Sequence, residues 1–464
     1  MTEAKTIREL KESGYELLPV REEMRRNLMA KLTQEEEVFP GIIGYQDTVI
    51  PQLQNAILSG QDIILLGERG QAKSRILRSL TSLLDEYTPV LDEIEIPENP
   101  FAPITAQGKQ RVAEMGDEAP IKWLHRDSRY GEKLATPDIT IADLIGEVDP
   151  IKIAEGRYLS DEEALHFGLI PHTNRGIFAI NELPDLAERI QVGLLNVMEE
   201  RDIQIRGHKI RLELDMLIVA TANPEDYTNR GRIITPLKDR YGSQIRTHYP
   251  ATMLEEITIM EQEQQKLNLG EYKETVPAFM SQIIAEITQY ARRSPDINQR
   301  SGVSVRATVS NYEALLANAL RRSIRTGEQE VVPRISDLPF IIPSLQGKIE
   351  FEAMEEGRED KIMEKLFHDA IKAVYSRFTD NMELEPIALQ FADGMHVTTG
   401  ESIPSDDYND VIKRIDGLEE AIDKLSPSGN QGVRASTAEF IFEGLHLNQL
   451  LNKDRLGGRA TYHG

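Results

Sequence analysis

The sequence contains no cysteine among its 464 residues. Disulfide bonds, thiolate catalysis and cysteine-ligated zinc are therefore excluded. The nine histidines are scattered along the chain, and no two of them have the H-x-x-x-H spacing of a helical metal site. Neither residue type thus offers a metal site of a recognisable pattern.

Long apolar segments are also missing. No apolar run approaches the ~18 residues that a transmembrane helix needs. The N-terminal residues MTEAKTIR lack the apolar core of a signal peptide. We therefore expect a cytoplasmic protein with no membrane span.

Basic residues are scarce relative to acidic ones. The chain has 53 Lys and Arg against 77 Asp and Glu, which gives a net charge of −24. A nucleic-acid surface would need a basic stripe, so the charge weighs against nucleic acid as a partner. Proteins and nucleotides remain as partners, and the length allows two or three domains.

One stretch carries a recognisable chemical motif. An apolar run at 62–66 is followed by the loop G-E-R-G-Q-A-K-S and then by a helical pattern. This order matches the phosphate-binding motif G-x-x-x-x-G-K-[ST], in which the lysine reaches the β- and γ-phosphates and the serine ligates Mg²⁺. An ordinary glycine-containing turn is the alternative, but the flanking strand and helix favour ATP binding. The predicted ATP-binding residues are Gly67, Glu68, Arg69, Gly70, Gln71, Ala72, Lys73 and Ser74.

One position of this loop departs from the motif. Ala72 stands where the motif has its second glycine. Alanine is small and tolerates the right-handed helical conformation, so we expect the loop to close. It would fail to close if this residue needed a positive φ.

A second motif follows a buried strand predicted at 177–180. Asn181 and Glu182 would lie at the carboxyl end of this strand, where an open α/β sheet binds ligands. An acidic residue here holds the Mg²⁺ shell in phosphate-loop NTPases, and a neighbouring Glu polarises the attacking water. A carboxylate after an apolar strand is more often a plain loop residue. Together with the loop that ends at Ser74, however, the functional interpretation is favoured.

Two further strands and a hairpin are predicted from the sequence. A buried strand at 216–220 is followed by Asn223, which could contact the γ-phosphate or water; the alternative is a turn formed by Asn-Pro. Alternating apolar and polar residues at 203–212 indicate a β-hairpin. We expect the second strand of the chain around Ile121–Leu124, within a sizeable insertion.

These motifs, in this order, resemble the AAA+ ATPases of the magnesium chelatase I-subunit and MoxR group over roughly residues 37–345. Gly67–Ser74 is similar to the Walker A loop and Ile177–Glu182 to Walker B. The sequence around Asn223 resembles sensor 1, L-K-D-R-Y around Arg240 resembles the arginine-finger segment, and S-V-R ending at Arg306 resembles sensor 2.

The resemblance implies an α/β AAA+ core with a parallel sheet, followed by an α-helical lid and an α-helical C-terminal extension. The implied division is an N-terminal arm at 1–36, the core at 37–250, the lid at 251–345 and an acidic extension of unknown role at 346–464. It implies an ATPase that uses ATP and Mg²⁺ and forms a homo-hexamer, with a von Willebrand A-domain or chelatase-subunit-like protein as partner.

The resemblance also assigns roles to single residues. The implied catalytic residues are Glu182, Asn223, Arg240 and Arg306, where Arg240 completes the site of the neighbouring subunit. The implied metal residues are Ser74 and Asn181. The group has Asp where this chain has Asn181, and Asn can orient an Mg²⁺-bound water but contributes no charge.

Three alternatives stay open at this point. A sigma-54 activator is also AAA+, but this chain lacks the G-A-F-T-G-A loop and a basic helix-turn-helix. A nucleotide-binding scaffold with little hydrolysis would suit Ala72 and Asn181. A true magnesium chelatase ATPase subunit shares the motor core with a remodelling chaperone of the MoxR type.

Overall fold

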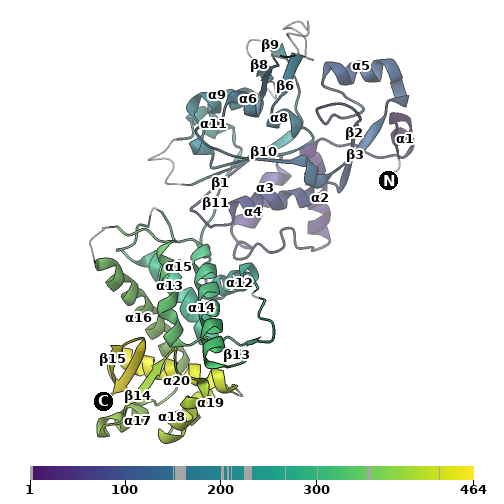
Figure 1. Cartoon of the computed structure of the whole chain (residues 1–464). Coiled ribbons are helices and arrows are strands. Elements are labelled where there is room, and N and C mark those ends of the chain that lie inside the picture. The colour runs from purple at the N-terminus through teal and green to yellow at the C-terminus, as the bar shows by residue number, and fades with distance from the viewer. Residues whose placement is uncertain are drawn as a thin grey trace. The chain divides into compact units, whose positions relative to one another are not determined.

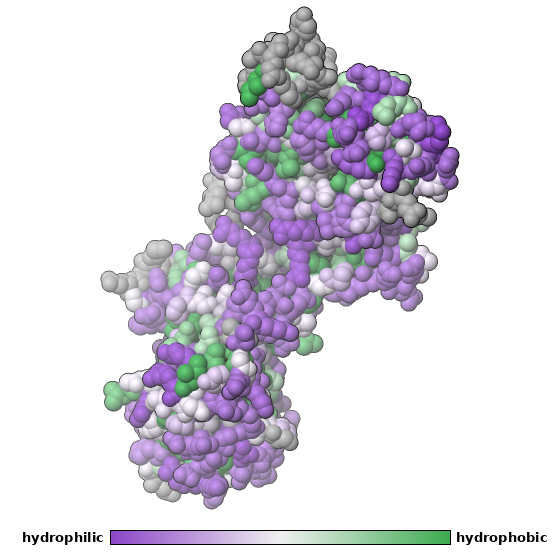
Figure 2. Space-filling view, turned by 45° about the vertical axis from the view of Figure 1, so that its right-hand side comes forward, coloured by the Kyte–Doolittle hydropathy of each residue, from purple (hydrophilic) through white to green (hydrophobic). Residues whose placement is uncertain are grey.

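The computed structural model describes residues 4–149, 151, 164–199, 203–205, 208–210, 212–223, 232–266, 268–299, 301–352, 357–427 and 429–464. The chain forms two compact units, Met1–His248 and Tyr249–Gly464 (Figure 1). No helix in the described ranges is both long enough and apolar enough to cross a membrane. The face drawn in Figure 2 is mostly hydrophilic, as the many charged residues lead one to expect.

A five-stranded parallel sheet forms the centre of the first unit. The order of its strands is β11 (Ser243–Arg246), β1 (Ile63–Leu66), β10 (Met216–Ala222), β7 (Gly176–Asn181) and β4 (Tyr130–Leu134). The apolar runs of the sequence thus lie in the three inner strands, where both faces are buried. The predicted parallel α/β core is confirmed.

Helices cover both faces of this sheet (Figure 1). Residues that alternate along the strands contribute to two separate cores, since successive side chains of a strand point to opposite faces. One face packs against α2 (Val20–Thr33), α3 (Val49–Leu58) and α4 (Lys73–Ser79). The other face packs against α9 (Glu188–Glu199) and α11 (Thr235–Arg240).

The strand predicted around Ile121–Leu124 is present, but it is the third strand of the chain and lies outside the main sheet. Ile121–His125 does form a strand, β3, but it pairs only with β2 (Tyr87–Leu91) in a separate antiparallel pair. The strand that completes the main sheet is β4, which pairs in parallel with β7. Its sequence Y-G-E-K-L is polar because the strand lies at the edge of the sheet.

A buried ion pair attaches helix α2 to the sheet. Glu23 accepts hydrogen bonds from both terminal nitrogens of Arg129, each at 2.7 Å. The two side chains are 3% and 0% exposed. Arg129 Nε also donates to the carbonyl oxygen of Arg175, just before β7. This ion pair makes helix α2 part of the first unit.

The remaining elements of the first unit are short. They are α1 (Ile7–Glu12), α5 (Ala106–Met115), α6 (Ile141–Leu144), β5 (Gly146–Val148), β6 (Leu165–Phe167), α8 (Leu169–His172), β8 (Ile203–Ile205) and β9 (His208–Ile210). Strands β8 and β9 pair antiparallel, which confirms the predicted hairpin. Its turn, at 206–207, lies outside the described residues.

The second unit has one hydrophobic core that runs from Met260 to Tyr462. Its long helices are α12 (Met253–Glu263), α13 (Ala278–Arg293), α14 (Val305–Thr326), α16 (Arg358–Thr379) and α20 (Gln431–Leu447). Phe279 of α13 stacks on Phe440 of α20 with 4.3 Å between ring centroids. The residues predicted as lid and as C-terminal extension thus share this core, and the finer domain boundaries stay predictions.

The C-terminal extension is helical, as predicted, but it also contains strands. β14 (Val397–Gly400), β16 (Arg459–His463) and β15 (Asn452–Leu456) form an antiparallel sheet in this order. The shorter elements of the second unit include β12 (Lys273–Glu274), β13 (Glu330–Val331), α15 (Ile342–Gln346), α17 (Glu385–Leu389), α18 (Tyr408–Arg414) and α19 (Leu418–Leu425).

Candidate active site

The carboxyl ends of three neighbouring strands bring the predicted site residues together. β1 leads into Gly67, β7 ends at Asn181, and β10 ends one residue before Asn223. Because the strands are parallel, their carboxyl ends lie together on the same side of the sheet. Residues far apart in the sequence therefore form one site.

The loop that begins at Gly67 is closely packed. A β-carbon at Gly67 would lie 1.9 Å from Thr247 Oγ1 and 2.2 Å from Gln71 Oε1, so no other residue fits without a shift. Gln71 Oε1 accepts hydrogen bonds from Glu68 N at 3.0 Å and Thr247 Oγ1 at 2.7 Å. Tyr45 donates its hydroxyl to the carbonyl oxygen of Gln71 at 3.0 Å. Burial raises the pKa of Tyr45 to about 12, so its hydroxyl keeps its proton.

Ala72 does not adopt the conformation expected from the sequence. Its φ is 54° and its ψ is 14°, which is the left-handed helical region. The premise that alanine would sit in the right-handed region was therefore wrong, although the loop closes. For a residue with a β-carbon, this conformation costs about 1–2 kcal/mol.

Lys73 lies at the centre of the loop and is 8% exposed. Its Nζ donates hydrogen bonds to the carbonyl oxygens of Gly67 and Glu68, the latter at 2.6 Å. It also donates to Asn223 Oδ1 at 2.7 Å. The Walker A-like lysine and the sensor 1-like asparagine, both buried, are thus in direct contact.

Ser74 and Asn181 meet as their predicted roles require. Ser74 Oγ donates a hydrogen bond to Asn181 Oδ1 at 3.2 Å. Thr221 Oγ1 donates to the same oxygen at 3.3 Å. The Asn181 amide nitrogen donates to Glu132 Oε1, on the neighbouring strand β4. The carboxamide of Asn181 is therefore held at both of its ends.

Glu132 also binds an arginine of helix α4. Arg78 donates two hydrogen bonds to its carboxylate, from Nε at 2.7 Å and from Nη2 at 2.8 Å. These hydrogen bonds and the charge of Arg78 lower the pKa of Glu132 below its ordinary value, together with the hydrogen bond from Asn181 and against the effect of burial. Glu132 is thus a carboxylate at neutral pH.

Glu182 lies next to Asn181 in a constrained backbone conformation. Its φ is 57° and its ψ is 47°, in the left-handed region. Its backbone N–H donates to Thr221 Oγ1 at 3.0 Å, which fixes the turn after β7. Its side chain is half-buried. Non-glycine residues in this region are found preferentially at functional sites, where the surrounding structure holds them.

Arg240 lies at the end of α11 and is held by helix α9. Its Nε and Nη2 donate to Glu199 Oε2, the former at 3.2 Å. Its Nη1 donates to the carbonyl oxygen of Pro236 at 3.2 Å. The exposed fractions of the Arg240 and Glu199 side chains are 29% and 52%, so the pair lies at the surface. The side chain of Arg240 is therefore bound to Glu199 of helix α9 and does not contact Lys73.

Arg306 lies in the second unit, in the first turn of α14. Its backbone N–H donates to Ser304 Oγ at 3.1 Å, and its side chain is exposed. Its role as sensor 2 stays a prediction. Pro224, which follows Asn223, lies outside the described residues.

The sequence analysis missed several partners of the site. Glu132, Arg78, Thr221 and Glu199 each contact a predicted site residue or its partner. Glu132 is 49 residues from Asn181 in the sequence, and Glu199 is 41 residues from Arg240. Strand pairing and helix packing bring these residues together, and no local sequence pattern predicts their contacts.

The residues present fit Mg²⁺ in a nucleotide complex. Within the described ranges, no group of three or more His, Asp or Glu side chains could hold a metal ion by itself. Mg²⁺ usually keeps several waters and binds through few protein oxygens together with the phosphates of its nucleotide. The hydroxyl of Ser74 and the oxygen of Asn181 form a donor set of this kind.

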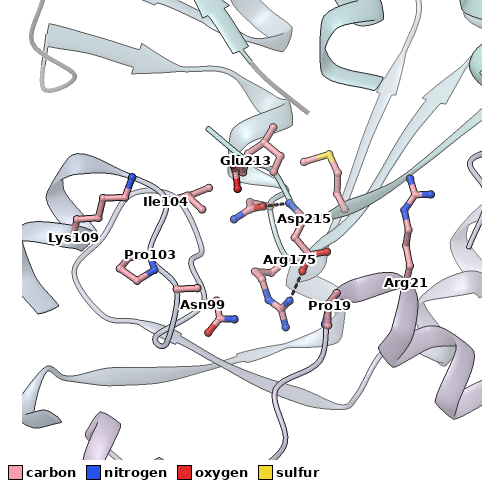
Figure 3. Close-up of a pocket in the computed structure, with 13 residues that line it drawn as sticks. Pro19, Arg21, Asn99, Pro103, Ile104, Lys109, Arg175, Glu213 and Asp215 are labelled. Carbon is pink, nitrogen blue, oxygen red and sulfur yellow. Dashed lines mark hydrogen bonds and ion pairs between the residues drawn. The ribbon is translucent and has the colours of Figure 1, made fainter. Parts of the chain in front are cut away.

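A cavity of about 750 Å³ lies at the amino ends of the strands, where β7 and β10 begin (Figure 3). Arg175 and Asp215 line it and form an ion pair. Asp215 also accepts hydrogen bonds from the first backbone N–H of α2, at 3.0 and 3.2 Å. These groups join α2 to the two strands, away from the predicted nucleotide site.

Known proteins resemble parts of the chain. The family model of the sigma-54 interaction domain matches residues 153–240. Magnesium-chelatase subunit ChlI of Nostoc sp. is 25% identical over 266 residues, which cover 55% of this chain and 64% of that protein. The subunit ChlI of Euglena gracilis is 29% identical over 234 residues, which cover 47% and 62%.

The chain spans about three fifths of the length of these curated relatives. A structure of the complex between subunits BchI and BchD of magnesium chelatase is 18% identical and covers 70% of this chain and 98% of that chain, with a TM-score of 0.35. The sigma-54 match includes the segment from β7 to Arg240 and covers a minor part of the chain. The resemblance to AAA+ proteins of the magnesium-chelatase I-subunit group is confirmed.

Proposed function

We propose that this relative of the magnesium-chelatase I subunits is an ATP-hydrolysing AAA+ ring motor that remodels or activates a partner protein. The observation that supports it best is that four predicted residues contact one another in pairs at the carboxyl ends of the strands. Lys73 contacts Asn223, and Ser74 contacts Asn181. A turn without function would not require contacts between three separate strand ends.

The loop from Gly67 to Ser74 binds ATP, with Lys73 as its cation. The backbone N–H groups of the loop surround the phosphates, and Lys73 exchanges its loop carbonyls for the β- and γ-phosphate oxygens. Ser74 and Asn181 hold the Mg²⁺ site through the hydroxyl and the amide oxygen. Mg²⁺ itself supplies positive charge that neutralises the phosphates.

Hydrolysis falls to Glu182, which takes the proton of the attacking water. Asn223 orients this water or the γ-phosphate from the end of β10. Arg240 of a neighbouring subunit stabilises the charge that develops on the phosphoryl group, as arginine fingers do. Arg306, in the region predicted as the lid at 251–345, is the proposed sensor 2 residue.

Assembly and partners follow from the same relationship. The trans role of Arg240 requires a ring, for which we propose a cytoplasmic homo-hexamer. A von Willebrand A-domain protein or a chelatase-subunit-like protein is the proposed partner. Among known proteins, the magnesium chelatase subunits BchI and BchD form a complex with each other.

A nucleotide-binding scaffold with little hydrolysis is a second candidate function. Two observations favour it, namely the strained Ala72 in the loop and the neutral Asn181 next to Ser74. A true magnesium chelatase ATPase subunit is the third, and only its partner distinguishes it from a remodelling motor.

The test measures binding, turnover and assembly on one preparation. We expect a fluorescent ATP analogue to bind in the presence of Mg²⁺, phosphate to be released steadily, and light scattering to show a larger particle with Mg·ATP. Binding without turnover, at concentrations where rings form, would favour the scaffold. No binding at all would refute the nucleotide site, and a pulldown with the intact ring identifies the partner.

A further inference from the structure

The asparagine at position 181 leaves the proposed Mg²⁺ site without the carboxylate that NTPases of this kind carry on this strand. The structure nevertheless places a carboxylate beside it. Glu132 projects from the adjacent strand β4, where Leu134 pairs with Asn181 and Glu132 pairs with Ala179. Its side chain is 21% exposed.

The contact between the two side chains decides how Asn181 is oriented. Both carboxylate oxygens of Glu132 accept hydrogen bonds from Arg78, and one of them also accepts from the amide nitrogen of Asn181. The amide oxygen of Asn181 must then point the other way, towards Ser74 and Thr221. Without an obligate acceptor on one side, the carboxamide could turn its nitrogen to Ser74 and repel a cation.

We propose that Glu132 replaces the missing Walker B carboxylate from the neighbouring strand: it orients Asn181 so that its oxygen faces the Mg²⁺ side, and it supplies the negative charge that Asn181 lacks. This inference rests on the proposed nucleotide site. Glu132 is a positioning residue, since it contacts Asn181 and adds its charge from beside the metal site.

The ion pair with Arg78 offers a purely structural alternative. In that case Glu132 would only fasten α4 to β4 through Arg78, whose side chain is 63% exposed. The two roles can be separated, because replacing Arg78 removes the ion pair and leaves the contact with Asn181 intact. Replacing Glu132 removes both.

The test measures how the affinity for a fluorescent ATP analogue depends on free Mg²⁺, with an EDTA series as reference. Residues that hold metal ligands in place typically affect metal affinity by about 10–100-fold. We therefore expect Glu132→Gln to raise the Mg²⁺ concentration for half-maximal binding by about tenfold. Its affinity in EDTA should stay close to that of the wild type.

Two further variants make the outcome decisive. Arg78→Met should leave the Mg²⁺ dependence unchanged or shift it to lower Mg²⁺. The double variant Asn181→Asp with Glu132→Gln returns the charge to β7 and should restore the Mg²⁺ dependence of the wild type.

Equal Mg²⁺ dependence of Glu132→Gln and wild type would overturn the proposal. A shift in Arg78→Met as large as that in Glu132→Gln would do so too, as would a double variant no better than the single one. If the wild type binds no nucleotide with or without Mg²⁺, the proposed function fails, and this inference fails with it. The two failures are therefore distinguishable.

Discussion

Lys73 Nζ lies 2.7 Å from Asn223 Oδ1, which joins the phosphate-binding loop after β1 to the residue that follows β10. Both side chains are buried, at 8% and 4% exposure. Lys73 Nζ also binds the carbonyl oxygens of Gly67 and Glu68, so both ends of the contact depend on one cation. An anion that enters the loop must displace these oxygens to pair with Lys73.

The first prediction follows from this position of Lys73. Lys73→Ala should weaken ATP binding at least about tenfold, because hydrogen bonds that involve charged groups contribute about 1.5–3 kcal/mol each. Titration with a fluorescent ATP analogue measures it. Lys109→Ala, at an exposed lysine far from the loop in sequence, is the control and should bind as the wild type does. Unchanged affinity in a folded Lys73→Ala protein would remove the loop from the nucleotide site.

The second prediction concerns the strained alanine of the loop. Ala72→Gly should stabilise the first unit by about 0.5–1 kcal/mol, since glycine adopts a positive φ without steric cost but loses more entropy on folding. Urea unfolding followed by the fluorescence of Trp123 measures it, because this single tryptophan lies in the first unit. Ala30→Gly, at an exposed position of helix α2, should instead destabilise by about 0.5–1 kcal/mol. Equal signs for the two variants would contradict the conformation of Ala72.

The inner strands of the sheet could be predicted because burial on both faces leaves a clear trace in the sequence. Runs such as Ile177–Ile180 have no polar residue to expose. The polar edge strand β4 leaves no such trace and was not predicted. An edge position thus explains why this strand was missed.

The site was predictable to the same extent as its local motifs. The residues from Gly67 to Ser74 are neighbours in the sequence, so one loop specifies them. The contacts of Glu132 and Glu199 depend on strand order and helix packing, which the sequence does not spell out locally. Ala72 adopts the left-handed conformation directly before helix α4, and propensity alone pointed to the wrong region.

The third prediction tests whether Arg240 acts on a neighbouring subunit. Arg240→Ala should bind ATP nearly as well as wild type but hydrolyse it at least about 10³-fold more slowly. Mixing it with Glu182→Gln should restore part of the activity, because one mixed interface then pairs an intact Glu182 with an intact Arg240. Phosphate release from mixtures whose co-assembly is verified measures it. No rescue in verified mixed rings would argue against a trans finger.

The fourth prediction concerns the residue that holds Arg240 within its own chain. Glu199→Gln removes the charge of a surface pair, and such pairs are worth about 0.2–1 kcal/mol. If Arg240 must leave Glu199 to act, ATP turnover should rise by up to about fivefold. Glu188→Gln, on the same helix but near Arg232, is the matched control and should leave turnover unchanged. A fall in turnover would mean that Glu199 positions Arg240 instead of competing for it.

The last prediction uses the contact between Asn181 and Glu132 in the absence of nucleotide and metal. Asn181→Asp places a second carboxylate against Glu132, which Arg78 keeps ionised by lowering its pKa. Two like charges at this distance should destabilise the first unit by about 1–3 kcal/mol. Urea unfolding followed by Trp123 fluorescence again reports on this unit.

Adding Glu132→Gln to Asn181→Asp should remove most of this cost, since the glutamine amide can donate to the new carboxylate. Glu132→Gln alone loses the charged acceptor of Asn181 and should cost about 1 kcal/mol. The double-mutant cycle therefore gives a coupling free energy of favourable sign for the exchanged pair. Additive effects of the two substitutions would show that Asn181 and Glu132 do not interact, and the orientation of the Asn181 oxygen towards Ser74 would then need another cause.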